Sequence, residues 1–259
     1  MKQRADFIGR SRELTVLSRA YQSKEAEMVA VIGRRRVGKT YLIRHAYEEQ
    51  IAFEMTGLQH GTKGSQLQNF TDQLTLYAQS SLPITIPENW QEAFQLLIKY
   101  LEGRKDAQKS VVFFDELPWI ATRKSGFLDA FGLFWNSWAS RNNVVVVICG
   151  SAASWMINKV VKNKGGLYNR ITKRVFLKPF NLAETEAFLL SRGVRMDRYQ
   201  ILQLYMAMGG IPHYLKEVVS GKSAVQNIDD ICFSEDGLLN AEFENLYFAL
   251  FDHAEKHIA

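Results

Sequence analysis

Residues 33–40 carry the clearest chemistry in this sequence. They read Gly-Arg-Arg-Arg-Val-Gly-Lys-Thr and fit the spacing G-x-x-x-x-G-K-[ST] of a phosphate-binding P-loop. Gly33 and Gly38 allow backbone angles and a close approach that side chains would block, so the amide N–H groups can form an anion-binding nest. Lys39 adds a charge for the β- and γ-phosphates, and Thr40 offers a hydroxyl oxygen to Mg²⁺. The pattern predicts a nucleoside triphosphate and Mg²⁺ as ligands.

The flanking residues suit this interpretation. Residues 28–32 form a short apolar, β-branched run typical of a buried parallel strand, and residues 41–49 predict a helix. A chance match in a glycine-rich turn is the alternative, and it does not explain a strand before and a helix after. The three arginines Arg34, Arg35 and Arg36 lie inside the loop, where a triphosphate can be their partner.

Two carboxylates end a second apolar run. Residues 110–116 read Ser-Val-Val-Phe-Phe-Asp-Glu, which predicts a buried strand. Asp115 then suits the Walker B role of holding the Mg²⁺ shell. Glu116 can polarise the water that attacks a γ-phosphate, a form of catalysis typically worth about 10² to 10⁴ in rate. A helix cap or a turn is the alternative role for this Asp-Glu pair.

Ser151 and Arg170 are further candidates. Ser151 follows the apolar run 144–150, and ligands of open α/β sheets bind beyond the carboxyl ends of strands. Its hydroxyl could touch the γ-phosphate or orient water, or it could cap the next helix. Arg170 follows a glycine pair and could act as an arginine finger on phosphoryl charge, with Arg174 as a weaker rival. A surface arginine is the alternative.

Residues 209–215 read Gly-Gly-Ile-Pro-His-Tyr-Leu between two expected helices. The glycines suit a helix end, and Pro212 suits the first turn of the next helix. One interpretation is a simple turn between helices. The other is that this turn approaches the nucleotide and reports its state.

The order of elements predicts the fold class. Apolar runs at 28–32, 51–58, 110–116, 143–150 and 173–177 alternate with helical patterns, which indicates a parallel α/β sheet. Ser11 is the expected N-cap of a helix over 12–23. After Pro179 the pattern becomes helical, over 182–191, 198–208 and 212–219, with a capping box at Asn181 and Glu184. We therefore expect a P-loop domain over 1–180 and a small helical lid domain over 181–259.

Composition limits the class of protein. The chain has 259 residues, a net charge of +5 and two cysteines, Cys149 and Cys232. The cysteines show no disulfide or metal-site spacing, and Cys149 reads as core. No apolar run approaches the ~20 residues of a membrane span, and the N-terminus lacks a signal-peptide pattern, so we expect a cytoplasmic protein without a membrane partner. The mild positive charge permits nucleic-acid binding without arguing strongly for it.

Taken in order, the motifs resemble those of the prokaryotic AAA-type ATPases often labelled archaeal ATPases, relatives of the STAND signalling ATPases. The matching stretches cover nearly the whole chain; they are residues 7–10 with 13–14, 33–40, 113–119, 150–151, 168–170 with 177–180, and 209–212. The P-loop alone is not specific to this family, whereas the ordered set is.

The resemblance implies a sheet of order 5-1-4-3-2 and a set of site residues. Phe7, Ile8 and Arg10 would lie near the adenine, Ser151 would be sensor 1, and Gly210 and Pro212 would belong to the sensor of the lid. Together with the loop itself, the expected nucleotide contacts are Phe7, Ile8, Arg10, Gly33, Arg34, Arg35, Arg36, Val37, Gly38, Lys39, Thr40, Tyr41, Ser151, Gly210 and Pro212. Family members usually continue into a winged-helix domain. We therefore expect this chain to be a short form or a fragment that stops near the point where the winged-helix domain would begin.

The leading hypothesis is an ATPase that acts as a switch, with ATP and Mg²⁺ bound between the α/β domain and the lid. Lys39, Glu116 and Arg170 are the expected catalytic residues, Thr40 and Asp115 the expected metal ligands, and slow hydrolysis to ADP the expected reaction. The alternative is a nucleotide-gated nucleic-acid-binding or toxin–antitoxin-type regulatory module with little hydrolysis. A homo-oligomer or a partner protein stays open. A small-molecule kinase is disfavoured because the sequence shows no residues that would define a phosphate acceptor site. A GTPase is disfavoured because the sequence lacks the Asn-Lys-x-Asp motif that reads guanine.

Overall fold

The computed structural model describes residues 7–80, 84–104, 108–161 and 169–240, and it divides into two compact units. The first unit comprises Arg10–Arg35 and Lys39–Leu177. The second, within the described residues, comprises residues 7–9, Arg36–Gly38 and residues 178–240. The sequence placed the division after residue 180, whereas the main break in the structure follows Leu177, where the last strand ends. The role of the second unit as a lid stays a prediction.

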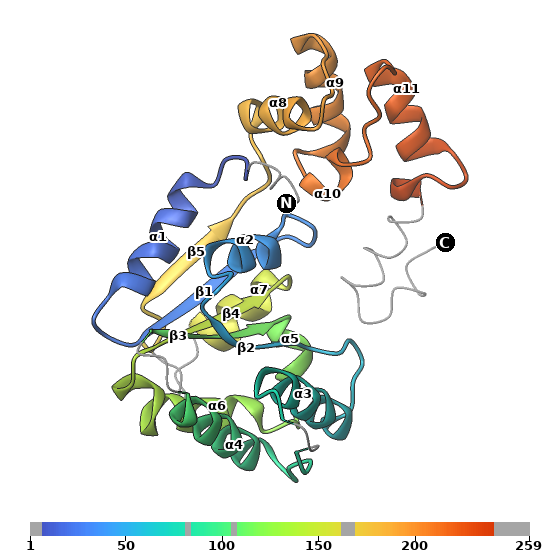
Figure 1. Ribbon diagram of the computed structural model, residues 1–259. Helices are drawn as coiled ribbons and strands as arrows, with labels where there is room; N and C mark the ends of the chain where they lie inside the picture. Colours follow the sequence, from blue (N-terminus) through green and yellow to red (C-terminus); the bar gives the residue numbers. More distant parts are fainter. Residues whose placement is uncertain (1–6, 81–83, 105–107, 162–168, 241–259) are drawn as a thin grey trace. The chain divides into compact units, whose positions relative to one another are not determined.

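Five parallel strands form the sheet of the first unit (Figure 1). They are β1 (Glu27–Gly33), β2 (Ile51–Thr56), β3 (Ser110–Asp115), β4 (Val144–Gly150) and β5 (Lys173–Leu177). Their order is β2-β3-β4-β1-β5, and every neighbouring pair is parallel. The predicted order 5-1-4-3-2 is confirmed, since it names the same sheet from the other edge. Because the strands are parallel, the carboxyl ends of β1, β3 and β4 meet at one edge.

Helices cover both faces of this sheet (Figure 1). On one face lie α3 (Lys63–Tyr77), α4 (Trp90–Gly103) and α6 (Phe127–Ser137), whose apolar side chains form one core with the strands. On the other face, α1 (Ser11–Gln22) and α2 (Lys39–Ala46) contact each other, and both contact β1. The strands that carry the P-loop and the carboxylates are thus held between two helical layers.

Aromatic rings fill the core between β3 and the helices. Phe94 of α4, Phe114 of β3 and Phe127 of α6 are each 2% exposed or less, and their ring centroids lie 5.6–5.9 Å apart in pairs. Such buried rings contribute large apolar area and prefer these tilted and edge-on arrangements. Since Phe114 directly precedes Asp115, this packing fixes the strand that ends in the carboxylate.

Several local predictions differ from the structure in their bounds. Ser11 is the first residue of α1 rather than its N-cap; Arg10 takes the cap position with φ 60°, and its side chain caps no backbone N–H. β2 ends at Thr56, two residues earlier than expected. The next residue, Gly57, has no room for a side chain, because a Cβ there would lie 2.8 Å from the Glu116 carbonyl oxygen. After β4 the chain is helical, with α7 (Ala153–Trp155) followed by a π-helical turn, Met156–Val161. Two further short helices are α5 (Leu117–Ile120) and a 3₁₀ turn, Ala139–Arg141.

The second unit is helical and has its own apolar core. Its helices are α8 (Leu182–Ser191), α9 (Arg198–Met208), α10 (Pro212–Leu215) and α11 (Ala224–Ile228), and a π-helical turn follows at Asp229–Phe233. The core is formed by side chains such as Leu189, Leu204 and Leu215. The predicted capping box of Asn181 and Glu184 is confirmed. Within the described ranges, no helix has the length and apolar character needed to cross a membrane.

Candidate nucleotide-binding site

The P-loop helix and the end of β3 meet through Thr40 and Asp115. The Thr40 hydroxyl donates a hydrogen bond to Asp115 Oδ2 at 2.6 Å, although the two residues are 75 positions apart in the sequence. Asp115 is 4% exposed, so its carboxylate is nearly withdrawn from water. The structure therefore brings the two predicted metal ligands together in one unit at the carboxyl edge of the sheet.

The loop itself is shaped by its two glycines for different reasons. Gly38 has φ +91°, a backbone angle that favours glycine. Gly33 has no such angle; instead a side chain there would collide with the Leu177 carbonyl of β5. Lys39 is 5% exposed, and its ammonium donates to the Arg34 carbonyl at 3.1 Å. The ammonium thus folds back onto a carbonyl oxygen of its own loop.

A second neighbour of Asp115 comes from β4. The Cys149 thiol donates to Asp115 Oδ1 at 2.9 Å, and the Glu116 backbone N–H donates to the same oxygen at 2.9 Å. Burial, together with the negative charge of Asp115, raises the pKa of Cys149 well above its ordinary value. The thiol therefore stays protonated and acts as a hydrogen-bond donor. Cys149 is core, as predicted, and it also orients the carboxylate.

Glu116 is held in an unusual backbone conformation. Its φ and ψ are 47° and 51°, in the left-handed region that non-glycine residues rarely adopt. Its side chain is fixed by Ser151 beyond β4, because the Ser151 hydroxyl and backbone N–H donate to Glu116 Oε2 at 2.9 and 3.2 Å. Strained residues of this kind persist where the surroundings determine them, and they cluster at functional sites.

The other predicted contacts are less concentrated. In the first unit, Arg34 and Arg170 are exposed, Arg35 is half-buried and Tyr41 is 60% exposed. Arg10 is 6% exposed with φ 60°, at the start of α1. The second unit contains Phe7, Ile8, Arg36, Val37, Gly38, Gly210 and Pro212. The structure unites Lys39, Thr40, Asp115, Glu116 and Ser151, and the roles of the remaining residues stay predictions.

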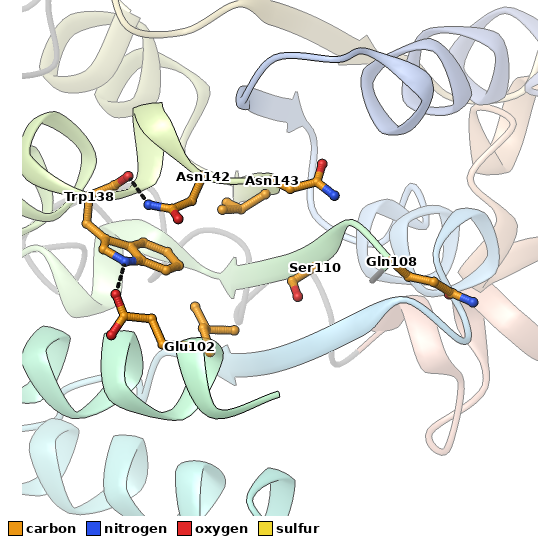
Figure 2. Close-up of a pocket in the computed structure, with 8 residues that line it drawn as sticks. Glu102, Gln108, Ser110, Trp138, Asn142 and Asn143 are labelled. Carbon is orange, nitrogen blue, oxygen red and sulfur yellow. Dashed lines mark hydrogen bonds between the residues drawn. The ribbon is translucent and has the colours of Figure 1, made fainter. Parts of the chain in front are cut away.

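A hollow of about 270 Å³ lies elsewhere on the first unit (Figure 2). It is lined by residues at the amino ends of two strands, among them Ser110 of β3 and Val144 of β4. Trp138 closes one side, where its indole N–H donates to Glu102 at 2.7 Å (Figure 2). Since ligands of open α/β sheets bind at the carboxyl ends, this hollow is at the opposite edge from the Asp115 cluster.

Sequence reasoning missed two of these contacts. The bond from Cys149 to Asp115 depends on the register of β3 and β4, in which Phe114 pairs with Ile148 and the next residues become neighbours. The bond from Ser151 to Glu116 depends on the paths of two loops beyond the strands. The available signal was that the two members of each pair lie at the carboxyl ends of two different strands.

This parallel sheet, with its P-loop and strand-end carboxylate, defines a P-loop ATPase fold. Residues 7–218 match the family described as "ATPase domain predominantly from Archaea", and the chain belongs to this family. The resemblance drawn from the ordered motifs is therefore confirmed. A relative is the uncharacterized protein MJECL04 of Methanocaldococcus jannaschii, 26% identical over 214 residues. The match covers 82% of this chain and 44% of that protein, so the chain spans less than half of the relative's length.

Solved structures agree on the fold. The Walker-type ATPase PABY2304 of Pyrococcus abyssi superposes with a TM-score of 0.67 at 18% identity, over 95% of this chain and 77% of that one. A STAND protein with a tetratricopeptide repeat sensor, PH0952 of Pyrococcus horikoshii, gives a TM-score of 0.51 at 21% identity, over 95% of this chain and 33% of that one. The predicted relation to the STAND group thus holds at the level of fold.

Proposed function

We propose that this chain binds ATP with Mg²⁺, hydrolyses it slowly and acts as a nucleotide-driven conformational switch. The observation that carries the proposal is the 2.6 Å hydrogen bond between Thr40 and Asp115. It joins a P-loop hydroxyl to a strand-end carboxylate, which is the pairing that an ATPase of this fold needs around its metal. Lys39, next to Thr40 and buried, supplies the positive charge for the phosphates.

The donor set suits Mg²⁺. Both atoms of the Thr40–Asp115 pair are hard oxygen donors, and Mg²⁺ typically takes one or two protein oxygens together with substrate phosphates. Thr40 and Asp115 would hold the ion, which would neutralise charge on the β- and γ-phosphates when bound. Cys149 and the Glu116 backbone N–H orient Asp115 Oδ1, so the carboxylate is already fixed by the protein.

Glu116 is the proposed base for the attacking water. It directly follows Asp115, and its carboxylate accepts two hydrogen bonds from Ser151. To orient a water molecule, Glu116 must share or exchange these bonds, which is a physical reason to expect slow turnover. Arg170 is the proposed arginine finger, and its side chain is exposed. The chain near it is attached to β1 at Thr172, two residues later, because the Thr172 hydroxyl accepts a hydrogen bond from the Met28 N–H.

The switch requires a difference in binding energy between two states. A shift from 1:99 to 99:1 needs about 5.5 kcal/mol of differential binding. Two to four charge-assisted hydrogen bonds at about 1.5–3 kcal/mol each would supply it. Lys39, Ser151 and Arg170 are the proposed sources of the contacts to the γ-phosphate that hydrolysis removes. Since the curated relative is more than twice as long as the matched region, its partners and clients enter only as proposals.

A second candidate is nucleotide-gated binding of nucleic acid with little hydrolysis. The supporting observation is the surplus of positive charge, +5 for the chain. The affinity of a basic protein for DNA falls steeply as the salt concentration rises, because binding releases cations condensed on the DNA and added salt opposes that release. A DNA affinity that depends on nucleotide and on salt would favour this candidate over the hydrolytic switch.

One experiment separates these proposals. The protein is purified without added nucleotide, the nucleotide it carries is identified by mass spectrometry, and phosphate release is measured with and without DNA. Co-purified ADP or ATP with slow, Mg²⁺-dependent phosphate release supports the switch. Absence of both bound nucleotide and measurable affinity for ATP would contradict the proposed function.

A further inference from the structure

A carboxylate lies inside β2, where the sequence pattern calls for an apolar residue. Glu54 is 8% exposed, and its strand neighbours Phe53 and Met55 are fully buried. A buried charge is costly unless it is paired and hydrogen-bonded. Glu54 therefore needs a partner of opposite charge. Its position is close to the candidate metal site, because Glu54 pairs in the sheet with Phe113 of β3, two residues before Asp115.

The partner is Arg44 of the P-loop helix. Arg44 Nε donates to both carboxylate oxygens of Glu54, at 2.9 and 3.2 Å, and a terminal nitrogen donates to Oε1 at 2.6 Å. The Arg44 side chain is 59% exposed, whereas that of Glu54 is 11% exposed. The guanidinium thus closes over a buried carboxylate with a fork geometry that lysine cannot reproduce.

Arg44 and Thr40 lie on the same side of α2. They are four residues apart, a spacing that places side chains one above the other on a helix. Thr40 contacts Asp115 of β3, and Arg44 contacts Glu54 of β2. The helix is therefore attached to two adjacent strands along one face, with the attachment to β2 one turn beyond the attachment to β3.

The charges of these residues are also coupled. The pKa of Arg44 is raised above its ordinary value, mainly by the hydrogen bonds to Glu54, with the charges of Glu54 and Asp115 adding to the effect while partial burial opposes it. The negative charge of Asp115 therefore stabilises the positive charge of Arg44. If the charge of Glu54 is removed, Arg44 remains as an uncompensated cation near a carboxylate that would bind Mg²⁺.

We propose that Glu54 supports the Mg²⁺ site through its charge: by neutralising Arg44, it prevents an uncompensated cation from repelling the ion that Thr40 and Asp115 would hold. This inference rests on the proposed function, since it concerns the same metal site. It adds a residue that lies outside the P-loop and outside the strand-end carboxylates. A purely structural ion pair would stabilise the fold without changing how the site responds to Mg²⁺.

The test is a Mg²⁺ titration of the full chain with a fluorescent ATP analogue, alongside thermal unfolding. We expect Glu54→Gln to raise the Mg²⁺ concentration at half-saturation about threefold or more, because a nearby cation repels the ion. The affinity in EDTA should stay within about twofold of the wild type, since Lys39 and the loop are intact. The matched control is Asp230→Asn, which breaks an exposed ion pair with Lys222 in the second unit.

The double variant Arg44→Met/Glu54→Gln tests whether the uncompensated charge of Arg44 causes the higher Mg²⁺ midpoint of Glu54→Gln. Because it removes both charges, it should return the Mg²⁺ midpoint to within about twofold of the wild type. Arg44→Lys keeps both charges and loses the fork, so its midpoint should move less than that of Glu54→Gln. A Glu54→Gln protein with a lower melting temperature and an unchanged Mg²⁺ midpoint would overturn the inference. A wild type that binds the analogue without any response to Mg²⁺ would instead contradict the proposed function.

Discussion

Ser151 holds the carboxylate of Glu116. Its hydroxyl and its backbone N–H both donate to Glu116 Oε2, at 2.9 and 3.2 Å, from the loop that follows β4. Glu116 itself has a left-handed backbone at the end of β3. A serine expected to contact phosphate, water or a helix end is thus bonded to the proposed catalytic base. Ser151 and Glu116 therefore act together, because the two hydrogen bonds from the serine set the direction of the carboxylate.

Removing the Ser151 hydroxyl should slow hydrolysis more than it weakens binding. With one of two donors gone, Glu116 samples other orientations, and we expect turnover by Ser151→Ala to fall about tenfold, since small misplacements of catalytic groups are costly. Steady-state phosphate release and ATP affinity are measured together. Ser137→Ala is the control, because the Ser137 hydroxyl donates to the Leu133 carbonyl within α6, away from the Glu116 carboxylate. Unchanged turnover in Ser151→Ala would show that this bond does not orient the base.

Glu116→Gln should separate binding from chemistry. The amide keeps the size of the side chain and cannot accept a proton, so turnover should fall by about 10² to 10⁴. The ATP affinity should change by no more than about twofold, because Lys39, Thr40 and Asp115 remain. Single-turnover kinetics with labelled ATP measures both quantities, and Glu235→Gln, on an exposed residue of the second unit, is the control. Wild-type turnover in Glu116→Gln would remove Glu116 from the mechanism.

Gly210 is required by packing as well as by backbone angle. It has φ +66°, and a side chain there would collide with the Phe180 carbonyl. The Phe180 N–H donates a hydrogen bond to the Gly210 carbonyl at 2.8 Å, which keeps the two backbones close. Gly209 has a similar φ of +63° but open space around it. We expect Gly209→Ala to cost about 1 kcal/mol, from the backbone alone, and Gly210→Ala to cost clearly more. Equal melting temperatures for the two variants would contradict this assignment.

His213 should make the second unit less stable in acid. Burial, with the nearby cations Arg36 and Lys216, lowers its pKa below the ordinary value of 6.5. A group with a depressed basic pKa binds its proton more readily when unfolded, so stability is lost as the pH falls through 6.5 toward the folded pKa. Melting temperatures at pH 7.5 and 5.5 test this, and His213→Gln should show a smaller loss than the wild type. An equal or larger loss in His213→Gln would place the acid sensitivity elsewhere.

Much of the fold follows from local sequence. The apolar runs of β1, β3 and β4 are long enough to be recognised without partners, and the P-loop fixes what must follow β1. Asp115 ends β3 and accepts a hydrogen bond from Thr40, so it lies beside the P-loop helix, where the pattern predicted a strand-end carboxylate. The strand order came from the resemblance of the ordered motifs to a family rather than from periodicity.

The remaining contacts depend on tertiary structure. Glu54 does not fit the apolar pattern of β2, because a charge in a buried strand is unexpected until Arg44 is seen to cover it. The contact between Ser151 and Glu116 depends on where two loops turn, which no pattern in either loop specifies. Ser11 had the right residue type for an N-cap, yet the left-handed Arg10 takes the N-cap position, so the helix begins at Ser11, one position earlier than expected.

The central claim is that Lys39, Thr40 and Asp115 form a binding site for ATP with Mg²⁺, and its most direct test is the ATP affinity of Lys39→Ala. Isothermal titration calorimetry with Mg²⁺ compares this variant with the wild type and with Lys99→Ala, on an exposed lysine of α4. Loss of one charged hydrogen-bond donor predicts an affinity about 10- to 100-fold weaker for Lys39→Ala and no change for Lys99→Ala. An affinity of Lys39→Ala equal to that of the wild type would contradict the account.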